Sequence, residues 1–266
     1  MILFPPAKIN LGLYVLDQRT DGLHNIETCM VEIPITDVLE VIPNRKFEFI
    51  TSGLSIPSST EDNIIYKAYT MLKGEYNLPD IYCHLRKSIP MGAGLGGGSS
   101  DAAYMLKALS ELFELNLSSE ELKEKASKLG SDCSFFIEGG VQIGRGNGSE
   151  LTHSTLDLSG LYLKIINNDI HVSTKDAYSN VLRNAGHLNL DVLKREMIGD
   201  WKGSFQNSFE GSVFALHPSL AEIKENLYEE GAIYSGMSGS GSTIFGIYEK
   251  KPEYSGGFQF ERVVAL

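Results

Sequence analysis

The segment from Gly92 to Ser100 constrains this chain more than any other, because it holds five glycines within seven consecutive positions. Glycine leaves no side chain between the backbone and a ligand, so the amide groups of such a segment can close around an anion. The apolar residues that follow recur at helical spacing: Ala102, Met105, Leu106, Leu109 and Phe113. The positive end of this helix would face the same anion. The sequence therefore predicts a phosphate-binding loop that leads into a helix.

Two familiar phosphate loops fit this segment poorly. Gly92, Gly94 and Gly97 satisfy the Gly-x-Gly-x-x-Gly spacing of a dinucleotide-binding fold. That fingerprint belongs to the first strand–helix turn of a regular βαβ array, whereas several strand-like runs and a helix precede it here. A Walker loop needs a lysine directly after its glycines, and none follows here. A tight connection without any ligand is the remaining alternative, and the paired serines at the helix start argue against it.

Strand-like and helix-like patterns alternate irregularly along the chain. Strands are predicted at residues 7–15, 28–42, 46–50, 81–86, 161–166, 232–235, 242–248 and 258–264. Helices are predicted after Asp62, from the glycine loop onward, after the Ser118–Glu121 capping box, from near Thr174 with Leu182 on its apolar face, and from Pro218 to Gly231. Such a mixture indicates an α+β protein.

The length of 266 residues suits two modest domains. Residues 139–149 are rich in glycine and poor in apolar side chains, so we expect the boundary there, with domains at 1–148 and 149–266. The formal net charge of −11 argues against a protein that binds nucleic acid or an anionic membrane. The sequence shows no apolar run long enough to span a membrane, and no secretory signal is visible. We therefore expect a cytoplasmic protein.

Three stretches of the sequence carry a family resemblance: residues 6–11 (Pro-Ala-Lys-Ile-Asn-Leu) with 21–24 (Asp-Gly-Leu-His), the loop at 90–103, and residues 237–242 (Met-Ser-Gly-Ser-Gly-Ser). Together they resemble the GHMP kinases, the family of galactokinase, homoserine kinase and mevalonate kinase. The resemblance implies a two-domain α+β fold, with an N-terminal domain like the second domain of ribosomal protein S5 and a ferredoxin-like C-terminal domain. It also implies phosphoryl transfer from ATP, with Mg²⁺ accompanying the nucleotide.

Within this family, the Ala-Lys-Ile-Asn start and the Asp-Gly-x-His element select one branch. Its reaction, phosphorylation of the 2-hydroxyl of a cytidine-diphosphate-linked methylerythritol, belongs to non-mevalonate isoprenoid precursor biosynthesis. The implied partner is thus a small-molecule substrate, and no binding to nucleic acid or to a membrane is expected. We expect a monomer or a weak homodimer.

The resemblance implies catalytic roles for Lys8 and Asp132. A carboxylate at Asp132 can accept the proton of the attacking hydroxyl, and a cation at Lys8 would keep that carboxylate ionised. The alternation of the first strand places Lys8 and Asn10 on one face. Without the resemblance, Asp132 reads as a helix cap and Lys8 as an edge residue of a strand.

The nucleotide is expected at the glycine loop. The resemblance implies ATP contacts for Asn63, which also reads as a helix cap, and for every loop residue: Pro90, Met91, Gly92, Ala93, Gly94, Leu95, Gly96, Gly97, Gly98, Ser99 and Ser100. The hydroxyl of Ser100 is the candidate magnesium ligand.

The acceptor is expected to contact residues from both halves of the chain. The resemblance implies substrate-binding roles for Asn10, His24, Thr174, Tyr178, Gly239 and Ser240, with His24 hydrogen-bonded to cytosine. Leu23 stands where relatives often carry an aromatic residue, so stacking on the base would be one-sided, from Tyr178.

Three other functions remain as alternatives. Another acceptor within the family, such as mevalonate or homoserine, would leave the mechanism unchanged. A catalytically silent sensor with this fold is disfavoured by the presence of Lys8 and Asp132. A dinucleotide-dependent oxidoreductase could be tested by NAD binding.

Overall fold

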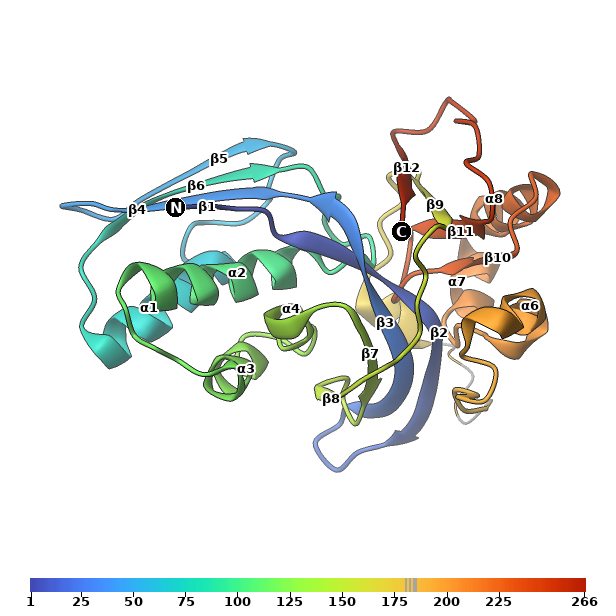
Figure 1. Cartoon of the computed structure of the whole chain (residues 1–266), viewed down its shortest axis with the longest axis horizontal. Helices are drawn as coiled ribbons and strands as arrows, with labels where there is room; N and C mark the ends of the chain where they lie inside the picture. The colour runs from blue at the N-terminus through green and yellow to red at the C-terminus, as the bar shows by residue number, and fades with distance from the viewer. Residues whose placement is uncertain (180, 182, 184–185) are drawn as a thin grey trace. The chain divides into compact units, whose positions relative to one another are not determined.

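The computed structural model describes residues 1–179, 181, 183 and 186–266, and its elements are drawn in Figure 1. The chain forms two compact units. Unit 1 comprises Met1–Ala7, Ile35–Met91 and Gly96–Gly139, and unit 2 comprises Lys8–Pro34, Gly92–Leu95 and Gly140–Leu266. The chain thus passes between the units several times. The domain ranges 1–148 and 149–266 stay a prediction.

Unit 1 is built on a four-stranded sheet in the order β1–β4–β6–β5, with β5 parallel to β6 and the other neighbours antiparallel. The strands are β1 (Ile2–Leu3), β4 (Val38–Pro43), β5 (Glu48–Gly53) and β6 (Ile81–Lys87). The helices are α1 (Ile64–Tyr76), α2 (Gly97–Leu112), α3 (Ser119–Ser127) and α4 (Phe135–Glu138). Helices α1 and α2 cover one face of this sheet (Figure 1).

Sequence patterns explain these elements. Strand β6 alternates, and it buries Ile81, Cys83 and Leu85. Helix α1 buries Ile65, Ala68 and Leu72 at helical spacing. Helix α3 begins at the predicted capping box, in which Ser118 and Glu121 each bind the other's backbone amide.

Unit 2 holds two four-stranded sheets. The first has the order β2–β3–β7–β8, and the second has the order β10–β11–β9–β12 with all neighbours antiparallel. The strands are β2 (Pro6–Gln18), β3 (His24–Thr36), β7 (Val141–Arg145), β8 (Glu150–His153), β9 (Tyr162–Asn167), β10 (Tyr234–Met237), β11 (Ile244–Tyr248) and β12 (Phe260–Ala265).

Two findings differ from the sequence expectation for these strands. The single strand predicted at residues 28–42 is two strands, because Asp37 interrupts it between β3 and β4. The glycine-rich stretch at 139–149 contains β7 and the turn that leads to β8, and β7 pairs with β3.

The helices of unit 2 are α5 (Thr174–Ser179), η1 (Arg195–Asp200), α6 (Trp201–Ser204), α7 (Glu210–Leu216) and α8 (Pro218–Glu229). Helix α8 begins at Pro218, as predicted, and buries Leu220, Ile223 and Leu227 in the core of this unit. The helix predicted from Thr174 is observed to Ser179, and Leu182, expected on its apolar face, lies outside the described residues.

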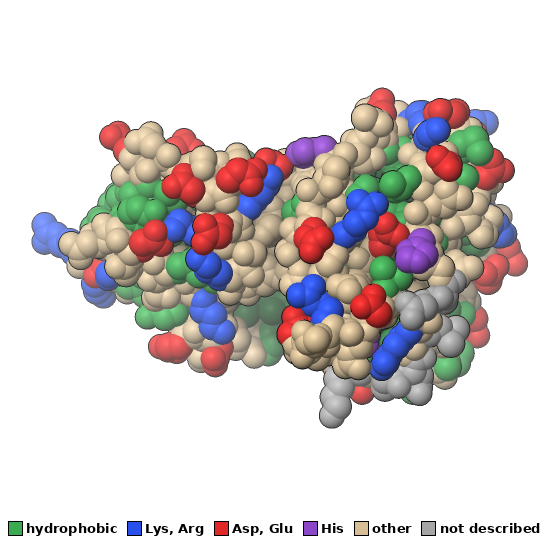
Figure 2. Space-filling view, turned by 90° about the horizontal axis from the view of Figure 1, so that it is seen from below, with side chains coloured by type: hydrophobic (Ala, Val, Ile, Leu, Met, Phe, Trp, Pro, Cys, Tyr) green, Lys and Arg blue, Asp and Glu red, His purple; other side chains and the backbone are tan. Residues whose placement is uncertain are grey.

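In the described part of the chain, no helix combines the length and the apolar character that crossing a membrane requires. On the face shown in Figure 2, acidic and basic side chains are interspersed.

Candidate active site

In unit 2, the middle of the glycine loop is hydrogen-bonded to two segments that are far away in the sequence. The amide of Lys8 in β2 donates to the carbonyl of Leu95 at 3.0 Å, and the amide of Thr243, just before β11, donates to the carbonyl of Ala93 at 3.2 Å. The first, second and third sequence motifs therefore meet at residues 92–95.

The closest of these contacts joins Gly94 to the turn after β10. Ser238 Oγ donates to the Gly94 carbonyl at 2.8 Å. A Cβ on Gly94 would lie 2.0 Å from the Ser238 carbonyl oxygen, and one on Gly239 would lie 3.1 Å from Gly94 Cα. Both glycines also have positive φ angles, +79° at Gly94 and +58° at Gly239. Packing as well as conformation therefore requires glycine at Gly94, and a side chain at Gly239 would be in tight contact with the loop.

Lys8 is buried and held by a chain of hydrogen bonds. Its Nζ donates to Asn10 Oδ1 at 2.6 Å, Asn10 Nδ2 donates to Thr28 Oγ1 at 2.9 Å, and Thr28 Oγ1 donates to the Gly12 carbonyl at 2.6 Å. The shared face of Lys8 and Asn10 is thus confirmed. The lysine is only 3% exposed, so it is no solvated edge residue.

Asn207 organises the turn that meets Gly94. Its Nδ2 donates to the carbonyls of Met237 at 2.7 Å and Gly239 at 2.8 Å, while its Oδ1 accepts from the Phe209 amide at 3.0 Å. The sequence alone suggested no role for this side chain. An asparagine before a short helix is a weak signal, and its partners lie about 30 residues away.

The two predicted cytosine-binding rings contact each other directly. The centroids of His24 and Tyr178 lie 5.1 Å apart in a stacked arrangement, and Phe209 meets Tyr178 edge-on at 4.8 Å. His24 Nε2 is buried without a hydrogen-bond partner among the described residues. Leu23 is 54% exposed. Thr174 begins α5, but its side chain lies outside what the structure describes.

In unit 1, the glycine loop ends at the start of α2. Gly96 is the N-cap in a left-handed conformation, with a φ of 69° and no side-chain cap. The first amides of α2 thus lack both an intrahelical acceptor and a capping side chain, which suits them to an anion. Ser100 is fully buried, and its Oγ has no partner within the described residues.

Asp132 lies in the turn that precedes α4, beside the start of α2 within unit 1. A Cβ on Gly130 would lie 3.3 Å from Cys133 Sγ and 4.0 Å from Ser99 Oγ. Burial raises the pKa of Cys133 to about 12, against the hydrogen bond from Ser99. The turn that carries Asp132 therefore reaches the loop serines. The expected pairing of Lys8 with Asp132 joins unit 2 to unit 1 and stays a prediction.

The remaining residues predicted to bind ATP comprise one helix cap and loop residues that differ in their degree of burial. Asn63 caps α1, with its Oδ1 accepting from the Ile65 amide at 2.9 Å, which is the alternative role expected for it. Ala93, Leu95 and Gly97 are buried, Met91 and Gly92 are exposed, and the others are intermediate: Pro90, Gly94, Gly96, Gly98 and Ser99. Ser240 is half-buried beside Gly239.

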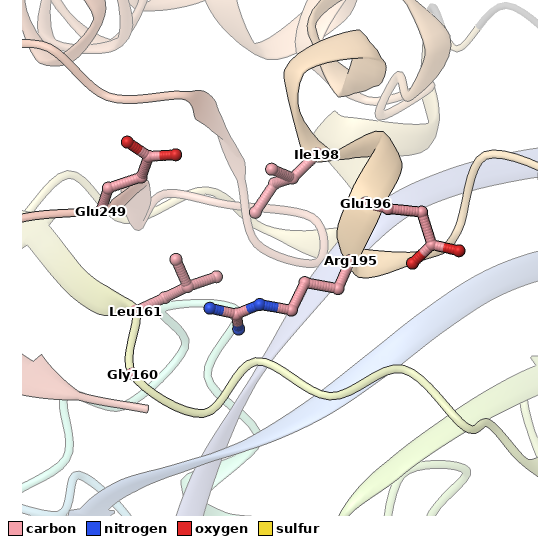
Figure 3. Close-up of a pocket in the computed structure, with 6 residues that line it drawn as sticks. All are labelled: Gly160, Leu161, Arg195, Glu196, Ile198 and Glu249. Carbon is pink, nitrogen blue, oxygen red and sulfur yellow. The ribbon is translucent and has the colours of Figure 1, made fainter.

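A separate cavity of about 520 Å³ lies elsewhere in unit 2. Figure 3 shows its lining, in which Arg195 extends towards Leu161. The guanidinium already donates to the Ser159 carbonyl at 2.8 Å. None of the predicted site residues lines this cavity, so it has no part in the candidate site.

Two family models match the chain. The GHMP kinases N terminal domain matches residues 63–149, and the GHMP kinases C terminal model matches residues 190–254.

Curated relatives match over nearly the whole length. The "4-diphosphocytidyl-2-C-methyl-D-erythritol kinase" of Cytophaga hutchinsonii is 46% identical, over 95% of this chain and 94% of the relative. The protein of the same name from Bacteroides fragilis is 45% identical, over 93% and 92%.

Solved structures agree with these relatives. A crystal structure of a 4-(cytidine 5'-diphospho)-2C-methyl-D-erythritol kinase superposes with a TM-score of 0.81 at 32% identity, over 94% of this chain and 91% of that one. A homoserine kinase from Cytophaga hutchinsonii has a TM-score of 0.68 at 19% identity, which shows a shared fold alone.

Proposed function

Because this chain belongs to the GHMP kinase family, in the branch of the 4-diphosphocytidyl-2-C-methyl-D-erythritol kinases, we propose that it phosphorylates that alcohol with ATP. The γ-phosphoryl group of ATP is transferred to the 2-hydroxyl of the erythritol moiety. The products are ADP and 4-diphosphocytidyl-2-C-methyl-D-erythritol phosphorylated at its 2-hydroxyl.

The observation that carries this proposal is the meeting of the three motifs at residues 92–95. Lys8 from the first motif and Ser238 and Thr243 from the third region bind the loop backbone directly. A glycine-rich loop held in this way presents backbone amides in fixed positions. Phosphoryl transfer depends mainly on such positioning and on neutralisation of charge.

The loop and the start of α2 fit the phosphates of ATP. The uncapped first turn of α2 offers amide donors, and the glycines remove the side chains that would keep a phosphate away. Mg²⁺ would neutralise phosphate oxygens, and the unpartnered hydroxyl of Ser100 is our candidate for its protein ligand.

Asp132 accepts the proton of the attacking hydroxyl in this proposal. The turn that holds it lies against the start of α2, next to Ser99, so it is close to where the phosphates would bind. A carboxylate in this position takes the proton as the new bond to phosphorus forms.

Lys8 supplies a fixed positive charge. Its hydrogen bond to Asn10 and its burial limit the positions of the ammonium group to a small volume. An ammonium fixed in this way stabilises negative charge that develops during transfer, without reorganising at the moment of reaction.

The acceptor base is bound near His24 and Tyr178 in this proposal. The buried Nε2 of His24 has an unused hydrogen-bonding capacity among the described residues, which a pyrimidine could satisfy. Leu23 adds an exposed apolar side chain but no ring. Recognition of cytosine therefore depends on Tyr178 for stacking.

A coupled ADP-release assay tests the proposed function. The protein is supplied with Mg²⁺ and ATP, and it is offered 4-diphosphocytidyl-2-C-methyl-D-erythritol, mevalonate, homoserine or galactose in separate reactions. We expect turnover of the cytidyl substrate alone. Turnover of a different acceptor would keep the phosphoryl-transfer chemistry and refute the substrate. ATP binding without turnover of any acceptor would favour a sensor.

A further inference from the structure

Three ionisable side chains form a buried cluster beneath the start of α2, in unit 1. Lys87 Nζ donates to Asp101 Oδ2 at 2.8 Å and also forms an ion pair with Asp37. The side chains of all three are at most 3% exposed. Charges are seldom buried unless their partners are fixed, because each must be compensated for lost hydration.

This cluster is bonded to both stems of the glycine loop, residues 88–89 before the loop and 97–101 after it. On the first stem, Asp37 Oδ1 accepts from the amides of Ser88 at 2.5 Å and Ile89 at 2.9 Å. On the second stem, Asp101 lies in the first turns of α2 and binds Lys87. A single lysine therefore joins the two stems through one carboxylate on each side.

Lys87 also lies against the first residue of α2. A Cβ on Gly97 would lie 2.8 Å from Lys87 Nζ, so a larger residue there would displace the ammonium group. A cation near a helix N-terminus is unfavourable, since the helix dipole is positive there. The Asp101 oxygen that accepts from the Lys87 ammonium offsets this repulsion.

We infer that Lys87 and Asp101 are positioning residues, which hold the two stems at the spacing at which the loop amides bind the ATP phosphates. A loop with five glycines has large conformational entropy, so the geometry of its amides depends on how its ends are fixed. The cluster fixes both ends at once, from inside the protein. This inference rests on the proposed function, because it assigns the loop to ATP.

The test replaces Asp101 by alanine and by asparagine. Asp101→Ala removes the oxygen that Lys87 binds, and we expect the KM for ATP to rise about tenfold, with a smaller change in the KM for the acceptor. Asp101→Asn keeps an oxygen that can accept from Lys87, so its KM for ATP is expected to stay within about twofold of that of the unsubstituted protein. Binding of ADP, measured by calorimetry, is expected to follow the same order.

Asp80→Ala is the matched control. Asp80 forms an ion pair with Lys73 and accepts a hydrogen bond from Tyr69 in the same unit. Its loss therefore removes an ion pair and a hydrogen bond away from the loop stems. We expect no change in the KM for ATP. Equal KM values in Asp101→Ala and the unsubstituted protein would overturn the inference. Failure of the unsubstituted protein to bind ADP or to turn over would instead refute the proposed function.

Hydrogen exchange in the unsubstituted protein gives a second measurement, should Asp101→Ala not fold. If the cluster ties the stems together, the amides of Ser88 and Ile89 and those of residues 100–103 open together at one slow rate. Independent exchange of the two stems at different rates would also overturn the inference.

Discussion

The imidazole ring of His24 lies on the phenol ring of Tyr178, with the centroids 5.1 Å apart and the planes inclined by 25°. At this separation the rings already stack on each other, so they leave no space for a third ring. A pyrimidine that binds here must therefore stack on an outer face of the pair or displace His24.

Stacking on Tyr178 can be tested without opening the core. Because Tyr178 also packs on Phe209, Tyr178→Leu keeps the apolar contact and removes only the ring. We expect the KM for the acceptor to rise about tenfold, with the KM for ATP unchanged, given the usual contribution of a base–aromatic stack. Tyr178→Phe is the control and should behave like the unsubstituted protein. An unchanged acceptor KM in Tyr178→Leu would exclude this role.

Replacement of Asp132 by asparagine tests the proposed proton acceptor. The amide cannot take the hydroxyl proton, so kcat should fall by about 10²–10⁴-fold. Binding of ATP should remain nearly intact, as calorimetry can show. Asp191→Asn, an exposed site in unit 2, serves as the control. Near-normal turnover of Asp132→Asn would refute the assignment.

Lys8→Ala should lower kcat by about 10²-fold or more, because it removes a buried charge that Asn10 holds in place. Lys8→Arg should not restore the rate, since the guanidinium is larger and planar and cannot reproduce the 2.6 Å contact to Asn10. Steady-state kinetics on both variants checks this. Lys67→Ala, at an exposed position, should leave kcat unchanged. Recovery of the rate by arginine would show that charge alone suffices.

Asn207→Asp should destabilise unit 2. The substitution replaces the donor that binds the carbonyls of Met237 and Gly239 by a second acceptor. Leaving these buried groups unpaired should lower the free energy of unfolding by about 1–3 kcal/mol, as measured with denaturant. Asn189→Asp is the control, because Asn189 is exposed and its oxygen accepts from the Asp191 amide, a contact that aspartate can keep. Equal losses in the two variants would contradict the proposed role of Asn207.

Stability should depend on pH through Asp101. Burial and the neighbouring Asp37 raise the pKa of Asp101 from 3.8 to about 8, although the Lys87 ammonium opposes this shift; Cys83 also faces the carboxyl group. The folded protein then keeps a proton that the unfolded chain has lost. The stabilisation from this proton is present below about pH 4 and is lost as the pH rises to 8, by at most about 1.4 kcal/mol per pH unit.

Asp101→Asn cannot ionise, so its free energy of unfolding should vary less between pH 5 and pH 8 than that of the unsubstituted protein. Denaturant unfolding at several pH values compares the two. The same slope in both proteins would mean that Asp101 is ionised throughout this range.

Local patterns in the sequence predicted much of the fold. The Ser118–Glu121 capping box, the start of α8 at Pro218 and the glycine loop leading into α2 are all observed, because each is determined by residues close together in the chain. The comparisons confirm the predicted α+β GHMP kinase fold.

The break between β3 and β4 could not be predicted from local patterns. Residues 28–42 are rich in β-forming side chains, and Asp37 is one of four exceptions, with Glu32, Pro34 and Glu40, so local composition does not single it out. Its carboxylate is accommodated because Lys87 and two amides about 50 residues away bind it. Similarly, β7 forms in a glycine-rich stretch because β3 supplies its pairing partner. At Gly144, a Cβ would lie 2.9 Å from Met30 Cε, a contact that local spacing cannot reveal.

In the candidate site, too, local patterns predicted some residues and contacts between distant segments determined others. Lys8 and Asn10 could be assigned to one face by alternation, whereas Asn207 and the Lys87–Asp101 pair act through contacts between distant segments.

The contact of Gly94 with Ser238 also sets an order of events during synthesis. The ribosome completes the glycine loop long before it adds the turn at residues 238–243 that binds it. A nascent chain that ends before this turn can form the local structure around α2, but it has no partner for Gly94. The glycine loop therefore acquires its final packing only when about nine-tenths of the protein has been translated, so shorter nascent chains should lack the loop geometry on which the proposed ATP binding depends.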